Sequence, residues 1–213
     1  MGYPIILQLQ GVPCSVVGGG AVAARKVKRL LTSRAQVTVI APELTPVLQE
    51  MATAGKISWR QQTYVPGCLR GARLVFCTTA EPAVNREAAA EARAQGALVN
   101  DATSPQGSDF HVPASLQRGE LLLTVSTGGG SPELARQIRR ELETAYPEAF
   151  GAWLERLVAL RQKLQHELSG PQQRQAFWRQ ALSGAILDFV RQGQLDRAED
   201  ELRHAITDFG TES

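Results

Sequence analysis

A turn of three glycines between an apolar run and an alanine-rich run constrains the fold of this chain most. Residues 14–17 form the apolar run, and residues 21–32 have the spacing of a helix. This order predicts a β-strand, a tight turn and a helix N-terminus. Gly18, Gly20 and Ala23 fit the pattern G-x-G-x-x-G/A. Its small residues permit the turn, the approach of backbone amides to a pyrophosphate and close packing of the helix on the strand.

This glycine motif has two interpretations. Glycine triplets also occur in turns that bind nothing, so the motif has to be read with its surroundings. Here the strand before it and the helix after it are both present, as a dinucleotide site requires. We therefore predict that a dinucleotide binds with its phosphates at the positive end of the helix dipole.

The composition excludes several classes of protein. The chain has 213 residues, of which 43% are hydrophobic, and its 23 basic and 21 acidic residues leave a net charge of +2. This length suits one core with an appended smaller module, and the small net charge gives no reason to expect nucleic acid as a partner. No apolar run is long enough to span a membrane and no signal-peptide pattern opens the chain, so we expect a cytoplasmic protein.

Three cysteines bear on redox state and metal binding. Cys14, Cys68 and Cys77 are widely spaced, and they form neither a C-x-x-C motif nor a Cys/His pairing. We therefore expect reduced, buried thiols and no bound metal.

Short apolar runs alternate with helical segments over the first half of the chain. Strands are expected over residues 3–9, 36–40, 56–60, 73–77 and 97–100, and helices over residues 43–54 and 83–95. Strands that alternate with helices indicate a parallel sheet with helices on its faces. The first half is thus expected to be an α/β domain of Rossmann type, with residues 3–9 as an edge strand.

Polar residues follow several of these strands, at the edge where open parallel sheets bind ligands. Thr78 and Thr79 are expected beside the cofactor, although they could instead cap the next helix. The second strand is followed by Pro42 and Glu43, and no arginine stands there to receive the 2′-phosphate of NADP. Because the acid comes later than in a typical NAD site, this position alone does not distinguish the two cofactors.

The second half of the chain has a different pattern. Residues 110–114 and 121–126 are expected to form a hairpin outside the main sheet. A second glycine loop then leads to Ser131, which suits the N-cap of a helix, although such a loop can also bind an anion. Amphipathic helices are expected over residues 134–145, 148–168, 172–192 and 194–208. They predict a small bundle, whose core or partner-facing side chains include Trp153, Phe177, Trp178 and Phe189.

Several segments together resemble the precorrin-2 dehydrogenase family, which includes the N-terminal part of siroheme synthases and stand-alone dehydrogenase/ferrochelatases. The segments are Tyr-Pro-Ile-Ile-Leu-Gln-Leu (3–9), Val-Val-Gly-Gly-Gly-Ala-Val-Ala-Ala-Arg-Lys (16–26), Val-Ile-Ala-Pro-Glu (39–43), Val-Asn (99–100), Asp-Phe-His-Val-Pro-Ala (109–114) and Ser-Thr-Gly-Gly-Gly-Ser-Pro-Glu-Leu-Ala-Arg (126–136). The resemblance covers nearly all of residues 1–145, whereas the helical tail matches the family only in kind and length.

The resemblance implies an activity and an organisation. The activity is NAD⁺-dependent oxidation of precorrin-2, a tetrapyrrole, to sirohydrochlorin in siroheme synthesis, and it is left open whether insertion of ferrous iron follows. The implied organisation is a Rossmann NAD-binding domain over residues 1–112, a small dimerisation region over 113–145 and a helical C-terminal domain over 146–213. Members of the family assemble as homodimers, so a homodimer is expected here.

Site residues follow from the motif and from the resemblance. The cofactor-binding candidates are Gly18, Gly20, Ala21, Val22, Pro42, Glu43, Thr78 and Thr79. The substrate carries eight carboxylates, and arginine is suited to bind them. Our candidates are Arg118, Arg136, Arg139 and Arg140, for which a solvated helix face is the alternative.

The loop after Asn100 departs from the family pattern. Relatives place an important aspartate three residues beyond the asparagine, where an ungapped comparison puts Thr103. Asp101, or else Asp109, could supply a carboxylate that accepts a proton or holds iron, which a threonine cannot do. Asp101 and Thr103 are therefore the catalytic candidates, and dehydrogenase activity is expected ahead of chelatase activity. His111 is either a metal or proton-relay group or a structural histidine on a strand.

Two other functions remain open at this point. A non-catalytic NAD-sensing module would keep the glycine loop and use its helical tail to bind a partner. Such a module should bind NAD and ignore the tetrapyrrole. A chelatase without NAD chemistry is the other possibility, and the intact glycine loop argues against it.

Overall fold

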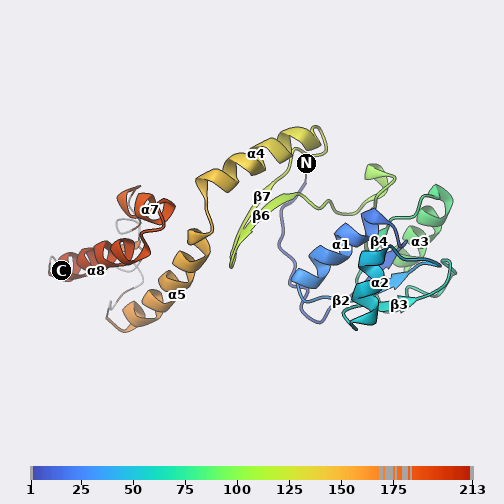
Figure 1. Cartoon of the computed structure of the whole chain (residues 1–213), viewed down its shortest axis with the longest axis horizontal. Helices are drawn as coiled ribbons and strands as arrows, with labels where there is room; N and C mark the ends of the chain where they lie inside the picture. Colours follow the sequence, from blue (N-terminus) through green and yellow to red (C-terminus); the bar gives the residue numbers. More distant parts are fainter. Residues whose placement is uncertain are drawn as a thin grey trace. The chain divides into compact units, whose positions relative to one another are not determined.

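The computed structural model describes residues 2–167, 170, 175, 177, 178, 182 and 184–211 (Figure 1). The chain divides into two compact units, Met1–Val112 and Pro113–Ser213. Each unit has a hydrophobic core of its own. No helix in the described part of the chain is long and apolar enough to cross a membrane.

A five-stranded parallel sheet in the order β3-β2-β1-β4-β5 forms the first unit. Its strands are β1 (Pro13–Val17), β2 (Gln36–Ile40), β3 (Ser58–Arg60), β4 (Leu74–Cys77) and β5 (Leu98–Asp101). Its helices are α1 (Ala21–Thr32), α2 (Pro46–Thr53) and α3 (Pro82–Ala94), and the 3-10 helix η1 (Pro105–Gly107) follows β5. The α/β fold of Rossmann type that the sequence predicts is confirmed.

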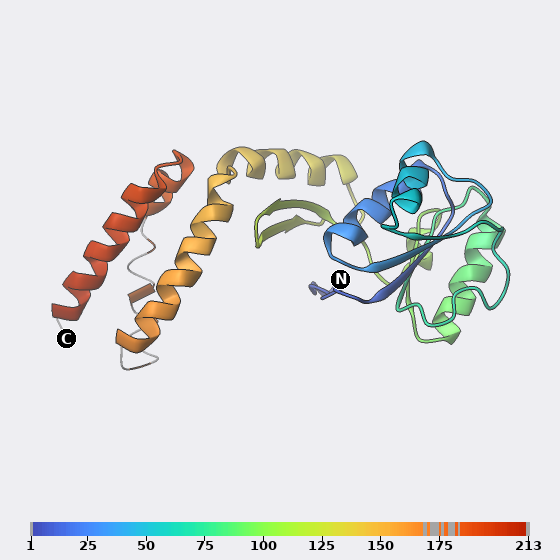
Figure 2. The same cartoon turned by 60° about the horizontal axis from the view of Figure 1, so that its bottom comes forward.

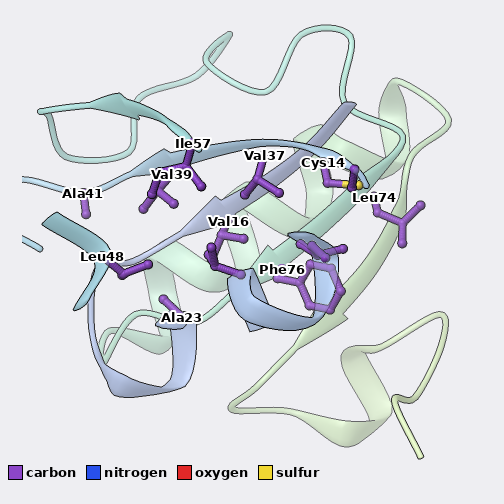
Figure 3. Packing of buried hydrophobic residues seen from close by; sticks show 13 residues of the cluster. Cys14, Val16, Ala23, Val37, Val39, Ala41, Leu48, Ile57, Leu74 and Phe76 are labelled. Carbon is purple, nitrogen blue, oxygen red and sulfur yellow. The ribbon is translucent and has the colours of Figure 1, made fainter. Parts of the chain in front are cut away.

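Adjacent residues of each strand face opposite layers of helices, as the two-residue period of a strand requires. Val16 belongs to a buried cluster with Ala23 of α1 and Leu48 of α2 (Figure 3). Its neighbour Val17 belongs to a second cluster with Ala88 of α3. Helices α1 and α2 therefore cover one face of the sheet and α3 covers the other.

The strand order reverses between β1 and β4, which are hydrogen-bonded neighbours in the sheet. The chain leaves β1 toward β2 on one side, and leaves β4 toward β5 on the other. Open parallel sheets bind ligands beyond the carboxyl ends of their strands at such a point. The tips of β1, β4 and β5 therefore define where a site is to be sought.

The buried thiols agree with prediction, whereas the predicted edge strand over residues 3–9 is wrong. Cys14, Cys68 and Cys77 are free and buried. Residues 3–9 form no strand, and residues 3–8 lie exposed; the strand that follows them, β1, already pairs with β2 and β4. The segment ends instead in a turn, in which the amide of Val12 donates to the carbonyl of Leu9 at 3.0 Å.

The strand predicted over residues 110–114 is also misplaced, since only Ala114 belongs to one. The ring of Phe110 packs edge-on against Phe76, with centroids 5.4 Å apart. Its carbonyl accepts a hydrogen bond of 2.9 Å from the side chain of Asn100. These contacts hold residue 110 against the first unit, so the hairpin strand begins four residues later. His111 consequently lies exposed on a loop rather than on a strand.

The second unit combines a β-hairpin with helices. The hairpin strands are β6 (Ala114–Arg118) and β7 (Leu121–Val125), and the helices are α4 (Pro132–Ala145), α5 (Ala149–Glu167), α7 (Gly184–Arg191) and α8 (Leu195–Thr211). The hairpin lies alongside α4 (Figure 2). Ser131 caps α4 as predicted, its side chain accepting from the amide of Leu134. Part of the helix predicted over residues 172–192 lies outside the described residues.

Aromatic side chains anchor the core of the helical part. Trp153 and Phe177 are almost completely buried, and Trp178 and Phe189 are partly buried against the same cluster. The interpretation of these four residues as core side chains is confirmed. Gly151 of α5 and Gly119 of the hairpin turn set the distance between these two elements. A Cβ on Gly151 would lie 2.9 Å from the carbonyl carbon of Arg118.

We expect Gly151→Ala to destabilise the second unit, because the added methyl group meets backbone that has no rotamer to change. The free energy of unfolding should fall by about 1–3 kcal/mol, as in other overpacked sites. Thermal unfolding followed by circular dichroism measures the effect. Gly184→Ala is the matched control, since nothing lies within 4 Å of a Cβ at that helical position. Equal unfolding temperatures for the two variants would contradict the packing argument.

Candidate functional site

The glycine turn after β1 is locked by the backbones on both sides of it. The amide of Gly18 donates to the carbonyl of Ile40 at 2.9 Å, and the amide of Thr78 donates to the carbonyl of Val17 at 2.8 Å. Gly18 has φ +115°, and a Cβ there would lie 2.8 Å from the hydroxyl oxygen of Thr78. Glycine is therefore required both for the backbone conformation and for the space.

Gly19 is required by the packing of the turn, although the G-x-G-x-x-G/A pattern did not single it out. A Cβ on Gly19 would lie only 1.9 Å from the carbonyl oxygen of Glu43. The carbonyl of Gly19 accepts a 2.9 Å hydrogen bond from the amide of Thr45. The turn after β1 thus packs directly on the loop after β2. The only sign of this in the sequence is that the residue between Gly18 and Gly20 is itself a glycine.

Gly20 is the N-cap of α1 and, unlike Gly19, has open space where a Cβ would project. The first turn of α1 begins with Ala21 and Val22, and it contains no acidic residue. No side chain caps this helix end. The arrangement leaves backbone amides and the positive end of the helix dipole available to an anion. Ala23 is fully buried beneath the turn, as the motif requires.

The other predicted cofactor residues surround this turn. Pro42 and Glu43 lie exposed after β2. Thr78 and Thr79 are partly buried after β4, and the hydroxyl of Thr78 donates to the carbonyl of Val17 at 2.9 Å. The structure therefore brings the ends of β1, β2 and β4 together around the glycine loop.

Asp101 and Thr103 form a hydrogen-bonded pair at the end of β5. The Asp101 side chain is 6% exposed. Its Oδ1 accepts from the hydroxyl of Thr103 at 2.7 Å and from the amide of Thr103 at 2.8 Å. Asp101 also affects the neighbouring thiol of Cys77. Burial raises the pKa of Cys77 to about 12, and Asp101 contributes to the rise.

Asp109, the other carboxylate considered for this site, has a structural position. Its carboxylate pairs with Arg93 of α3, with 2.9 Å between Oδ1 and Nε. Its Oδ2 accepts from the amide of Val99 at 2.9 Å. Arg93 also donates to the carbonyl of Gly107 at 2.7 Å. Asp109 therefore fastens the end of the loop to α3 and β5, which leaves Asp101 as the better placed carboxylate.

A cleft of about 360 Å³ lies between α1 and the end of β5. Its lining includes Val22, Arg25 and Lys26 from α1, together with Asp101 and His111. Burial lowers the pKa of Lys26 below its ordinary value, and the neighbouring Arg29 and Arg25 lower it further. The cleft therefore combines basic groups, a buried carboxylate and an exposed imidazole. Arg25 and Lys26 were missed because, in sequence, basic residues on a helix indicate only a solvated face.

A second hollow, of about 310 Å³, lies between α3 and the loop after β5. Asp101 and Thr103 line it, as do Arg86 and Arg93 of α3. Asp101 thus lines both the cleft beside α1 and this second hollow. Within the part of the chain that the structure describes, no three His, Cys, Asp or Glu side chains are grouped so that they could hold a metal ion.

The four arginines predicted to bind substrate all lie in the second unit, and each faces a glutamate. Arg118 is largely buried, donating to the carboxylate of Glu148 at 2.6 Å and to the carbonyl of Tyr146 at 3.0 Å. The other pairs are Arg136 with Glu133, Arg139 with Glu143 and Arg140 with Glu133. Their role in substrate binding stays a prediction.

Comparison with known proteins agrees with this geometry. Three family models match successive parts of the chain: "Putative NAD(P)-binding" over residues 5–114, "Sirohaem biosynthesis protein central" over 118–145 and "Sirohaem synthase dimerisation region" over 149–206. The chain belongs to the precorrin-2 dehydrogenase and siroheme synthase family. The first unit is therefore a domain that binds a nicotinamide dinucleotide. The family model described as a dimerisation region matches residues 149–206. The domain bounds expected from the sequence, 1–112, 113–145 and 146–213, stay a prediction.

Individual members of the family are similar over nearly the whole chain. The siroheme synthase of Nitrosococcus oceani is 38% identical over 203 residues, and that of Methylococcus capsulatus is 41% identical over 203 residues. Each alignment covers 95% of this chain and 43% of the relative, so this chain spans less than half the length of these relatives. A solved structure named SirC, precorrin-2 dehydrogenase, is 27% identical with a TM-score of 0.76, covering 97% of this chain and 100% of that chain.

We expect Gly19→Ala to destabilise the first unit, because its Cβ would collide with the carbonyl oxygen of Glu43. Gly20→Ala should leave the unfolding temperature close to that of the unmodified chain, since its Cβ meets nothing within 4 Å. Thermal unfolding followed by circular dichroism compares the two variants directly. An unfolding temperature for Gly19→Ala equal to that for Gly20→Ala would show that the loops after β1 and β2 do not depend on this contact.

Proposed function

We propose that this chain catalyses the NAD⁺-dependent oxidation of precorrin-2 to sirohydrochlorin. One observation carries the proposal: the buried carboxylate of Asp101 lines the same cleft as Val22, in the first turn of the glycine-loop helix. A proton acceptor and the cofactor-binding helix thus share one cleft. The similarity to a precorrin-2 dehydrogenase over the full length of that protein supports the choice of reaction.

Glu43 supports NAD rather than NADP as the cofactor. Its exposed carboxylate follows β2, at the end of the sheet where a Rossmann domain meets the adenosine ribose. A carboxylate there accepts hydrogen bonds from ribose hydroxyls and repels a 2′-phosphate. The amides at the start of α1, next to Ala21 and Val22, bind the pyrophosphate.

The chemistry requires one hydride acceptor and one proton acceptor. When bound, NAD⁺ supplies the hydride acceptor. Oxidation of precorrin-2 also releases a proton, so the products are sirohydrochlorin, NADH and H⁺. Asp101 receives this proton, and Thr103 orients its carboxylate by two hydrogen bonds to Oδ1.

Basic groups of the chain recognise the carboxylates of the tetrapyrrole. Arg25 and Lys26 line the cleft that contains Asp101, and their charges favour an anionic ligand. Four ion-paired residues remain candidates: Arg118, Arg136, Arg139 and Arg140. To bind the substrate, each would have to break its ion pair with a glutamate. Arg118 is the least available of them, because its side chain is only 14% exposed.

The proposal includes assembly as a homodimer in the cytoplasm. A family model described as a dimerisation region matches residues 149–206 of the second unit. The indole nitrogen of Trp153 is buried there without a hydrogen-bond partner among the described residues. The three free cysteines suit a reducing compartment. Light scattering after size-exclusion chromatography measures the mass, which should be twice that of the chain.

Turnover is tested by incubating the purified chain anaerobically with precorrin-2 and NAD⁺. NADH absorbance should rise in step with the spectrum of sirohydrochlorin. Asp101→Asn should lower kcat by about 100-fold, within the range measured for removal of a general base. Glu50→Gln, an exposed carboxylate on α2, is the matched control and should keep the activity of the unmodified chain.

The same assay separates the rival functions. NAD⁺ binding without NADH formation would overturn the enzyme proposal and favour an NAD-sensing module. Full activity of Asp101→Asn would remove this residue from the proton transfer. Adding ferrous iron to sirohydrochlorin tests metal insertion, for which Asp101 and His111 are the candidate groups lining the cleft.

Cofactor preference is tested at Glu43. Glu43→Gln should tighten binding of NADP⁺ by roughly 3- to 10-fold, because it removes one solvent-exposed charge near the 2′-phosphate. Its affinity for NAD⁺ should change much less. Titration of each nucleotide by calorimetry measures both values, and equal NADP⁺ affinity before and after the substitution would contradict the assignment.

A further inference from the structure

We propose that Asn85 is a positioning residue that fixes the Thr103 hydroxyl on the carboxylate of Asp101. Asn85 lies on α3 and is fully buried, with 0% of its surface exposed. It bonds to Thr79 at the end of β4 and to Thr103 in the loop after β5. This assignment rests on the proposed function, because it concerns the residue that would accept the proton.

Only one assignment of the side-chain oxygen and nitrogen of Asn85 fits its hydrogen-bond partners. The backbone amide of Thr79 can only donate, and it lies 3.1 Å from Asn85 Oδ1. The amide nitrogen of Asn85 is therefore the donor, reaching the carbonyl of Thr79 at 3.1 Å and the hydroxyl of Thr103 at 3.3 Å. Both hydrogens of the side-chain amide are thus used.

This donor decides where the hydroxyl hydrogen of Thr103 points. A hydroxyl has one hydrogen, so an oxygen that accepts from Asn85 keeps its own hydrogen for another acceptor. That acceptor is Asp101 Oδ1, 2.7 Å away. The chain of donors runs from Asn85 through Thr103 to the carboxylate, and its first member is also tied to Thr79 on the cofactor side. Asn85 therefore couples the strand tip beside the cofactor to the orientation of Asp101.

The loop has other anchors, so Asn85 is not needed simply to hold it. The amide of Asp101 and the hydroxyl of Ser108 are 2.9 Å apart, and Asp109 pairs with Arg93. The amide of Ala102 donates to the carbonyl of Cys77 at 2.9 Å. Loss of the Asn85–Thr103 bond should consequently disturb the carboxylate more than the path of the backbone.

Asn85→Asp tests the direction of the bonds. An aspartate of the same shape can still accept from the amide of Thr79, but as a carboxylate it cannot donate to Thr103. The Thr103 hydrogen then has two carboxylates to choose between. We expect kcat for precorrin-2 oxidation to fall about tenfold, the size of one hydrogen bond to a charged group. The KM for NAD⁺ and the Kd of NAD⁺ measured by calorimetry should stay within twofold.

Thr103→Val provides an independent test, because the Asn85 site is buried and a charge there can prevent folding. Thr103 is exposed, so its substitution should not prevent folding. It should lower kcat to the same extent, and the double variant should be no slower than either single variant, since one chain of donors is broken in all three. Thr53→Val on α2 is the matched control, as this threonine is also exposed.

The outcomes distinguish this inference from the proposed function. Absence of turnover by the unmodified chain would remove the proposed function itself. Turnover by the unmodified chain together with full kcat in folded Asn85→Asp or in Thr103→Val would overturn the positioning role alone. Strictly additive losses in the double variant would also overturn it, since they would mean that Asn85 and Thr103 act separately.

Discussion

The contact between Gly19 and the carbonyl oxygen of Glu43 is the constraint on which the first unit depends. It forces the turn after β1 and the loop after β2 to share one edge of the sheet, with no room for even a methyl group between them. The next residue, Gly20, is the N-cap of α1 and has open space where a Cβ would project. One backbone approach therefore holds the start of α1 next to the loop that carries the exposed Glu43. The nucleotide site that we propose at this edge would depend on that packing.

The sequence predicts the parts of this arrangement that depend on neighbours in the chain. Strand and helix periods, the glycine turn and the cap at Ser131 are local, and each of them is found. Residues 3–9 have the composition of a strand, but strand formation needs a free edge next to them, and β1 has none. The strand predicted from residue 110 is misplaced for the same kind of reason. Phe110 packs against Phe76, which lies on a strand more than thirty residues earlier in the chain.

Site residues differ in predictability for the same physical reason. Asp101 could be chosen as a candidate from the sequence, since it directly follows the predicted apolar strand and is the first acid of its loop. Asn85 could not, because an asparagine within an alanine-rich helix gives no sign of whether it faces water or a folded loop. Its burial arises only when the ends of β4 and β5 meet α3. Arg25 and Lys26 were hidden likewise, because the cleft beside them exists only after β5 takes its place in the sheet.

The loop after β5 contains a buried carboxylate although this chain has threonine where the family resemblance leads us to expect an aspartate. The family resemblance places an aspartate at position 103, where this chain has a threonine. Both the amide and the hydroxyl of Thr103 bind Asp101 Oδ1, so the threonine supplies the donors and the aspartate two residues earlier supplies the charge. A donor to the hydroxyl oxygen reinforces the orientation in which the hydroxyl hydrogen points to the carboxylate. In this chain that donor is the buried amide of Asn85, which links α3 to the site that we propose.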